Sequence, residues 1–184
     1  FGYDKASDVL AGFTYDFSPG SRTAVTGPTG IGKSTMTRLL LSLLHPREGR
    51  VVLYSEFGDE VWEVSPSLRG NLVYVPQGNS LFSGSIRDNL LMGNPDATES
   101  EMLEALHIAA ADFVTDFPSG LDTQCFEAGA GLSEGQAQRI AIARALLRPG
   151  SVLLLDEFSS ALDSATETAL MERLTAGLPD HTMI

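Results

Sequence analysis

The residues best suited to chemistry form a glycine-rich loop that fits the pattern G-x-x-x-x-G-K-[ST]: Gly27, Pro28, Thr29, Gly30, Ile31, Gly32, Lys33 and Ser34, followed by Thr35. In such a loop the backbone N–H groups curl around the β- and γ-phosphates of a nucleotide, and the start of a helix adds partial positive charge. Lys33 supplies a full charge to the same oxygens, and the Ser34 hydroxyl is a ligand for Mg²⁺. A chance glycine turn is the alternative, but an expected strand before the loop and an expected helix after it favour a nucleotide site.

An acidic pair, Asp156-Glu157, closes the most hydrophobic stretch of the chain, residues 152–155. Ligands of parallel sheets bind at the carboxyl ends of the strands, so we expect this pair beside the phosphate loop. Asp156 would hold Mg²⁺ through a water, and Glu157 would act as the general base for an attacking water. A solvated pair at a strand end is the alternative, and the phosphate loop upstream favours catalysis.

The elements of the first half must place the phosphate loop between a strand and a helix. Residues 9–17 alternate in part, with Phe13, Tyr15 and Phe17 on one face, and predict a half-buried antiparallel strand. This alternation indicates that Tyr15 is a core or sheet residue. Further strands are predicted over 23–26, 50–54 and 72–75, and leucines at helical spacing predict a helix over 33–44.

The second half is richer in helix signals. Thr98-x-x-Glu101 and Ser133-x-x-Gln136 fit the capping box that opens a helix, and the second of these helices should run to Arg148. The continuous apolar run 152–155 predicts a central parallel strand, and Ser164 should open a last helix. This order predicts an α/β fold: a P-loop NTPase core with an antiparallel β subdomain and an inserted helical subdomain.

Composition narrows the class of protein further. Twelve basic against twenty-four acidic residues give a formal charge of −12, which argues against nucleic acid as a partner because phosphate neutralisation needs surplus Lys and Arg. Cys125 is the only cysteine, so no intrachain disulfide forms. No apolar run approaches the roughly 20 residues that span a bilayer, so we expect a soluble domain. Both ends interrupt apolar stretches, which suggests a piece of a longer polypeptide.

A third motif makes the resemblance specific: Leu132-Ser133-Glu134-Gly135-Gln136 resembles the L-S-G-G-Q signature of the ABC ATPases, and 137–146 resembles the helix that follows it. Three other segments fall in the order of that family. They resemble the Q-loop (Tyr74-Val75-Pro76-Gln77), the D-loop (Ser160-Ala161-Leu162-Asp163) and the adenine-stacking loop (Phe1-Gly2-Tyr3). The resemblance covers essentially the whole chain.

The resemblance implies both a domain layout and a composite site. Residues 1–76 and 137–184 would form the ATPase core with its N-terminal antiparallel β subdomain, and 77–136 the inserted helical signature subdomain. One ATP with Mg²⁺ would lie between the phosphate loop of one copy and the signature of a second copy, homologous or identical. Tyr3 would stack on adenine, Gln77 would reach Mg²⁺ and the attacking water, and the family's contacts across the interface imply nucleotide-binding roles for Ser133, Gly135, Gln136 and Asp163.

The segments around the signature are similar to exporter-type ABC domains, notably 81–90 and Glu127-Ala128-Gly129. Core positions in the helical subdomain are the alternative for Phe82 and Ile86. The resemblance implies an ATP-hydrolysing motor domain attached to transmembrane domains at the cytoplasmic face of a membrane. Two alternatives are a soluble ABC ATPase without a membrane domain, which an acidic chain with a short helical lobe fits poorly, and a regulatory module that binds nucleotide without hydrolysis.

Several positions depart from the family pattern. Glu134 replaces a small signature residue, Phe126 stands where exporters tend to have Gly, and Phe158 stands where Ala is commoner. The family's switch histidine should lie beyond Ile184, because His181 precedes the final strand. We therefore expect the 184-residue chain to bind Mg²⁺–ATP but to hydrolyse it poorly.

Overall fold

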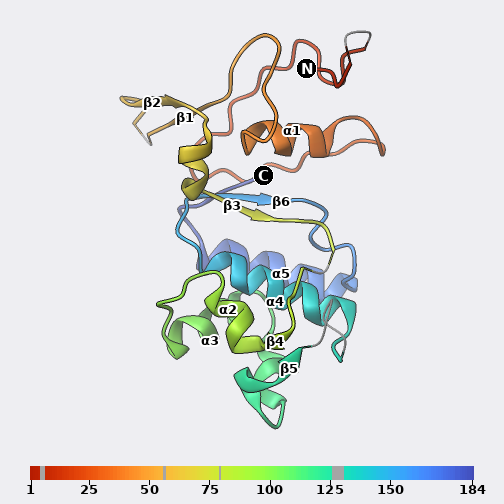
Figure 1. Ribbon diagram of the computed structural model, residues 1–184, viewed down its shortest axis with the longest axis vertical. Helices are drawn as coiled ribbons and strands as arrows, with labels where there is room; N and C mark the ends of the chain where they lie inside the picture. The colour runs from red at the N-terminus through yellow and green to blue at the C-terminus, as the bar shows by residue number, and fades with distance from the viewer. Residues whose placement is uncertain (5–6, 56, 79, 126–130) are drawn as a thin grey trace. The chain divides into compact units, whose positions relative to one another are not determined.

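The computed structural model describes the chain except residues 5–6, 56, 79 and 126–130, and it divides into two compact units (Figure 1). Unit 1 consists of Phe1–Leu72, Gly150–Leu154 and Asp180–Ile184. Unit 2 consists of Val73–Pro149 and Leu155–Pro179. The boundaries cut through two strands, so each unit is assembled from segments distant in sequence.

Unit 1 combines one helix with short strands: α1 (Lys33–Leu40), β1 (Val52–Tyr54), β2 (Val61–Glu63), the 3₁₀ helix η1 (Pro66–Asn71), most of β6 (Val152–Leu155) and β7 (Thr182–Met183). Strands β1 and β2 form an antiparallel hairpin that pairs Leu53 with Trp62. Strand β6 pairs with β7 in parallel, with Val152 opposite Thr182. Leu153 and Leu154 are each 1% exposed, as the continuous apolar run predicted.

Unit 2 is mainly helical: β3 (Leu72–Val75), β4 (Gly84–Ser85), α2 (Ile86–Leu91), α3 (Glu99–Ile108), η2 (Asp112–Asp116), η3 (Gly120–Asp122), β5 (Gln124–Cys125), α4 (Glu134–Leu146) and α5 (Ser164–Gly177). Helix α4 packs against α2 and α3, and α3 also contacts α5 (Figure 1). The core between these helices consists of side chains at most 2% exposed: Ile86, Leu90, Leu106, Ile140, Ile142, Leu170 and Leu174. The two predicted capping boxes, at Thr98 and Ser133, are confirmed.

Two predicted strands of the first half are wrong. Residues 9–17 and 23–26 contain no strand. Ser21 and Thr23 form backbone hydrogen bonds with Met183, and the Ser21 N–H also donates to Ser18. Arg22 forms an isolated parallel bridge with Met183, and no ladder within the described residues continues along 23–26. Phe13 and Tyr15 are 55% and 56% exposed, so the prediction that Tyr15 is a core or sheet residue is also wrong. Their rings nevertheless stack at 6.5 Å, which confirms the shared face.

Two helix limits also differ from the expectation. Helix α1 ends at Leu40 rather than Leu44, because Arg69 in η1 donates to the carbonyls of Leu41 and Ser42, each at 2.8 Å. The left-handed φ of 52° at Ser42 then turns the chain away. Helix α5 is capped by Asp163 rather than Ser164, since its carboxylate accepts from the N–H groups of Ala165 and Thr166.

Candidate nucleotide-binding site

The phosphate loop leads into α1 through a glycine that no other residue could replace without strain. Gly32, the residue before the helix, has a φ of 110°, which L side chains rarely adopt. A Cβ there would also lie 3.1 Å from Val9 and 3.2 Å from Leu10. No side chain caps the start of α1, so its first N–H groups remain for another acceptor.

Lys33 lies over this loop. Its Nζ donates to the carbonyls of Gly27 at 2.9 Å and Pro28 at 3.4 Å, and no salt bridge of the described residues involves it. Residues 27–31 and Ser34 are exposed. A cation without a carboxylate partner, an uncapped helix start and an open backbone loop together fit a polyphosphate ligand.

Tyr3 and Thr35, both predicted to bind nucleotide, are in direct contact. The Tyr3 hydroxyl lies 3.1 Å from Oγ1 of Thr35, and Arg38 also donates to it at 3.1 Å. These hydrogen bonds, with Thr35 the larger cause and Arg38 the next, lower the pKa of the Tyr3 phenol. Arg38 was missed by the sequence analysis, although its position three residues after Thr35 places both on one helix face.

Unit 2 brings together two of the three predicted catalytic residues, Gln77 and Glu157, while the third, Lys33, belongs to unit 1. The Gln77 amide donates to the Glu157 carboxylate at 2.7 Å across 80 positions of sequence. The neighbouring Asp156 accepts from the Tyr74 hydroxyl at 3.3 Å, and its backbone N–H donates to Val75 at 3.0 Å. Glu157 has a φ of 48°, an uncommon conformation for a residue with a side chain. The turn after β6 therefore presents two carboxylates, one of them held by an amide donor.

The signature segment forms the start of α4 in unit 2. Ser133 and Gln136 close a reciprocal capping box, with backbone-to-side-chain distances of 3.1 and 2.9 Å. Gly135 meets the loop before α5 closely, because a Cβ there would lie 2.9 Å from the Ala161 carbonyl oxygen. Glu134 is exposed in the first turn, where a carboxylate interacts favourably with the helix dipole.

Asp163 ends the loop that contacts Gly135 and begins α5. Its carboxylate accepts from the backbone N–H groups of Ala165 at 3.1 Å and Thr166 at 3.0 Å. Hydrogen bonds from the Thr166 side chain and then its backbone lower the pKa of Asp163. The structure thus connects the predicted signature and D-loop residues, while the phosphate loop and Tyr3 belong to the other unit.

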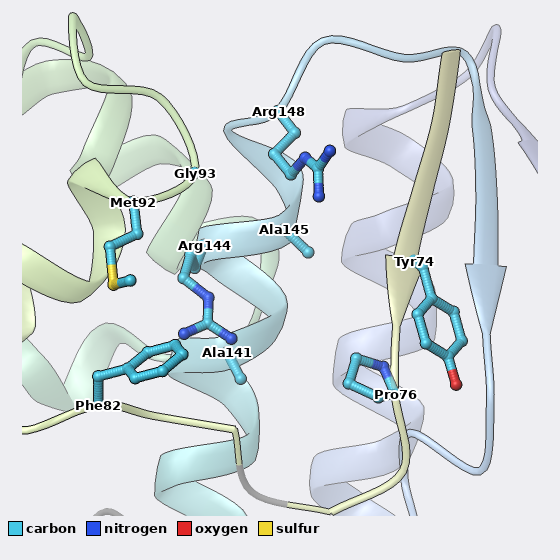
Figure 2. Close-up of a pocket in the computed structure, with 9 residues that line it drawn as sticks. All are labelled: Tyr74, Pro76, Phe82, Met92, Gly93, Ala141, Arg144, Ala145 and Arg148. Atoms are coloured by element: carbon cyan, nitrogen blue, oxygen red, sulfur yellow. The ribbon is translucent and has the colours of Figure 1, made fainter. Parts of the chain in front are cut away.

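Unit 2 also contains a pocket of about 220 Å³ beside the segment that follows Gln77 (Figure 2). The Arg144 guanidinium faces the Phe82 ring, 5.6 Å from its centroid, and donates to Ser80 at 2.9 and 2.7 Å. Phe82 is 55% exposed and Ile86 is fully buried, so the core alternative is wrong for Phe82 and confirmed for Ile86. The exporter-like segment Glu127-Ala128-Gly129, and Phe126, lie outside the described residues.

The predicted Mg²⁺ ligands are all oxygen donors: the Ser34 hydroxyl, the Gln77 amide and the Asp156 carboxylate. This donor chemistry fits a hard divalent cation. The described residues contain no group of three or more His, Cys, Asp and Glu side chains arranged to hold a metal. No helix within the described ranges is both long and apolar enough to cross a membrane.

Comparison with known proteins agrees with this geometry. The family model described as ABC transporter matches residues 10–160. The chain therefore belongs to the ABC transporter family and corresponds to the ATPase domain of that family. Its α/β fold, a P-loop core with an antiparallel β subdomain and an inserted helical subdomain, is the fold of these ATPases.

Several individual relatives are named as transporters or ATP-binding/permease proteins. It is 43% identical to the ABC multidrug transporter mdr2 of Aspergillus fumigatus over 93% of this chain and 21% of that protein. It is 42% identical to the mycobactin import ATP-binding/permease protein IrtB of Mycolicibacterium smegmatis, and 40% identical to the ATM1-type heavy metal exporter of Novosphingobium aromaticivorans, in both cases over 100% of this chain.

A solved structure of a bacterial Atm1-family ABC exporter with ATP bound superposes with a TM-score of 0.86 at 36% identity, covering 100% of this chain and 32% of that one. The chain thus spans between about a fifth and a third of the length of the proteins it matches.

Proposed function

We propose that this chain is the motor domain of an ABC membrane exporter, with ATP-driven dimerisation powering transport by attached transmembrane domains. The observation that carries the proposal is the open phosphate loop, where Lys33 faces backbone carbonyls at the uncapped start of α1. The relatives named as a multidrug transporter and a heavy metal exporter support the exporter subtype. The domain would then work at the cytoplasmic face of the membrane.

Different candidate site residues would bind the phosphates, the adenine base and the Mg²⁺ ion of ATP. The backbone of residues 27–32, Lys33 and Thr35 would hold the phosphates, and Tyr3 would stack on adenine. Ser34, Gln77 and Asp156 would hold Mg²⁺, which, when bound, neutralises phosphate charge. These assignments follow the oxygen-donor chemistry and exposure described above, together with the family pattern.

Hydrolysis would depend on Glu157. Its carboxylate would accept a proton from the water that attacks the γ-phosphate, and the Gln77 amide would orient the reacting groups. The hydrogen bond between Gln77 and Glu157 supports this pairing, since it aligns the amide with the base. Ser133, Gly135, Gln136 and Asp163 would act on the ATP of a second copy, so turnover would require a dimer.

The layout proposed for the chain is a core of residues 1–76 and 137–184 with a helical signature subdomain at 77–136. The helices α2 and α3 fall inside the proposed insertion and support its helical character. The exposed Phe82 and the pocket beside it are a surface that the attached membrane domain could contact.

Calorimetric titration with MgATP tests the proposal. The wild-type chain should bind, and Lys33→Ala should abolish binding because the loop loses its full charge. Arg50→Ala removes one exposed positive charge elsewhere in unit 1 and should leave affinity unchanged. Equal binding by wild type and Lys33→Ala would reject the site. In a longer form of the protein, Glu157→Gln should keep ATP binding and lose turnover.

A further inference from the structure

The Tyr3 side chain is held at its hydroxyl end and free at its ring. Thr35 Oγ1 and the Arg38 guanidinium each lie 3.1 Å from the hydroxyl, and both come from one face of α1. Tyr3 is nevertheless 58% exposed, and among the described residues the ring that approaches it is that of Phe1, edge-on at 5.2 Å. An aromatic ring fixed at one end, with a face left open, is suited to stack on a planar base.

Anchoring matters because a free tyrosine would lose rotational freedom when a base stacks on it. A ring already held in place has lost that freedom before the ligand arrives, and the affinity rises accordingly. Thr35 directly follows the phosphate loop in the first turn of α1, so its contact with Tyr3 connects the phosphate side of the site to the ring. Arg38 is the second anchor, and it lies one turn further from the loop.

Arg38 has no other evident role. Its side chain is exposed, and no salt bridge found in the described part of the chain involves it. The positive charge of Arg38 in the last turn of α1 interacts favourably with the helix dipole, but any cation at this position would do the same. The donor geometry toward Tyr3 is what distinguishes it.

We propose that Arg38 is a positioning residue for the adenine base: together with Thr35 it holds the Tyr3 hydroxyl so that the ring is oriented for stacking before the nucleotide binds. This inference rests on the proposed function, because it assumes that Tyr3 contacts adenine. In this arrangement Arg38 would act through Tyr3 and not by contacting the base or the phosphates. Its loss should therefore weaken ligands that carry a base and spare those that do not.

The test compares MgATP with magnesium tripolyphosphate, which has the phosphates but no base. Arg38→Met keeps the apolar stem and removes the donor, and should weaken MgATP about fivefold while tripolyphosphate stays within about twofold. Arg38→Lys should recover most of the ATP affinity, since it retains a charged donor. Arg50→Met is the matched control, because it removes an exposed arginine of unit 1 far along the chain from Tyr3.

A second readout follows Tyr3 itself. The hydrogen bonds from Thr35 and Arg38 lower the pKa of its phenol, so Arg38→Met should raise that pKa toward its ordinary value. The tyrosinate absorbance of each protein, minus that of the same protein carrying Tyr3→Phe, isolates this one phenol among four tyrosines. In the Tyr3→Phe background Arg38→Met should cause no further loss of ATP affinity.

The possible outcomes separate the inference from the proposed function. Unchanged ATP affinity and an unchanged Tyr3 titration in Arg38→Met would overturn the inference. Equal weakening of ATP and tripolyphosphate would also overturn it, because Arg38 would then act on the phosphates as a charge. If wild type binds neither ligand, the phosphate loop assignment fails instead.

Discussion

At the scale of single residues, the conformation of Glu157 is the most informative feature. Its φ of 48° is left-handed, and it costs a residue with a side chain roughly 1–2 kcal/mol. The side chain in turn accepts a hydrogen bond from Gln77 at 2.7 Å. Strain held at a charged, hydrogen-bonded residue is typical of functional sites, where the surrounding structure maintains a conformation that the residue alone would avoid. Here it supports the proposed role of Glu157 as the base.

This strain is measurable with two substitutions that differ only in backbone freedom. Glu157→Gly and Glu157→Ala both remove the carboxylate and its contact with Gln77, but only glycine adopts the left-handed conformation without strain. Glu157→Gly should therefore be more stable than Glu157→Ala by about 1 kcal/mol, after allowing for the larger unfolded-state entropy of glycine. Urea denaturation measures the difference, and equal stability would show that the backbone is relaxed in solution.

At the scale of elements, Arg144 joins two segments of unit 2. It projects from α4 and donates to both the carbonyl and the hydroxyl of Ser80, three residues after Gln77. Desolvation lowers the pKa of its guanidinium, as expected for a partly buried charge that has to be well hydrogen-bonded to be tolerated. The signature helix thereby holds the segment that follows the Q-loop.

Removing this connection should destabilise the helical unit. Arg144→Ala should lower the free energy of unfolding by about 2 kcal/mol, because two charge-assisted hydrogen bonds are lost. Arg144→Lys should recover only part of this, since an ammonium cannot reproduce the forked geometry. Arg148→Ala, at an exposed position of the same pocket, is the control and should change stability little. A loss as large in the control would contradict the role of Ser80.

The cap of α5 gives a pH dependence whose sign can be worked out. The folded state lowers the pKa of Asp163 through Thr166, while the unfolded chain has its ordinary value. The contribution to stability is therefore complete above the ordinary aspartate range and is lost as pH falls through the lower folded pKa. Asp163→Asn still caps a helix but does not titrate in this range, so its stability should fall less steeply in acid than that of wild type. Parallel acid denaturation curves for the two proteins would contradict this.

At the scale of the whole molecule, the candidate site residues are divided between the compact units. The phosphate loop and Tyr3 belong to unit 1, while Gln77, Glu157 and the signature belong to unit 2. The signature helix starts with exposed Ser133 and Glu134, and its cap is satisfied internally. This end of α4 is therefore accessible to another molecule, which is consistent with the proposed dimer in which one copy acts on the ATP of the other.

Sedimentation of the Glu157→Gln variant tests the dimer. With MgATP present, loss of the base should trap the ATP-bound state, so the sedimenting mass should double relative to the same protein without nucleotide. Ser133→Arg places a bulky cation at the signature and should prevent this doubling while MgATP still binds to each copy. A mass that stays monomeric in Glu157→Gln, or a dimer that survives Ser133→Arg, would contradict the composite site.

The sequence by itself determined the features that depend on near neighbours. In the capping boxes at Thr98 and Ser133 the hydrogen-bond partner lies three residues after the cap, so the local sequence is enough to predict them. The strand Val152–Leu155 was predicted correctly from its continuous apolar run. The motifs also assigned Gln77 and Glu157 to one catalytic site, although the hydrogen bond between them across 80 positions is known only from the structure.

Only the tertiary structure determined the features that depend on contacts between residues distant in sequence. Helix α1 ends four residues earlier than predicted, where Arg69 binds the carbonyls of Leu41 and Ser42, and no local sequence pattern indicates that contact. The alternation at Phe13 and Tyr15 is real, yet it produces no strand, because strand formation requires a partner backbone as well as a face. The anchoring of Tyr3 by Arg38 likewise joins residues 35 positions apart, and geometry alone shows that they meet.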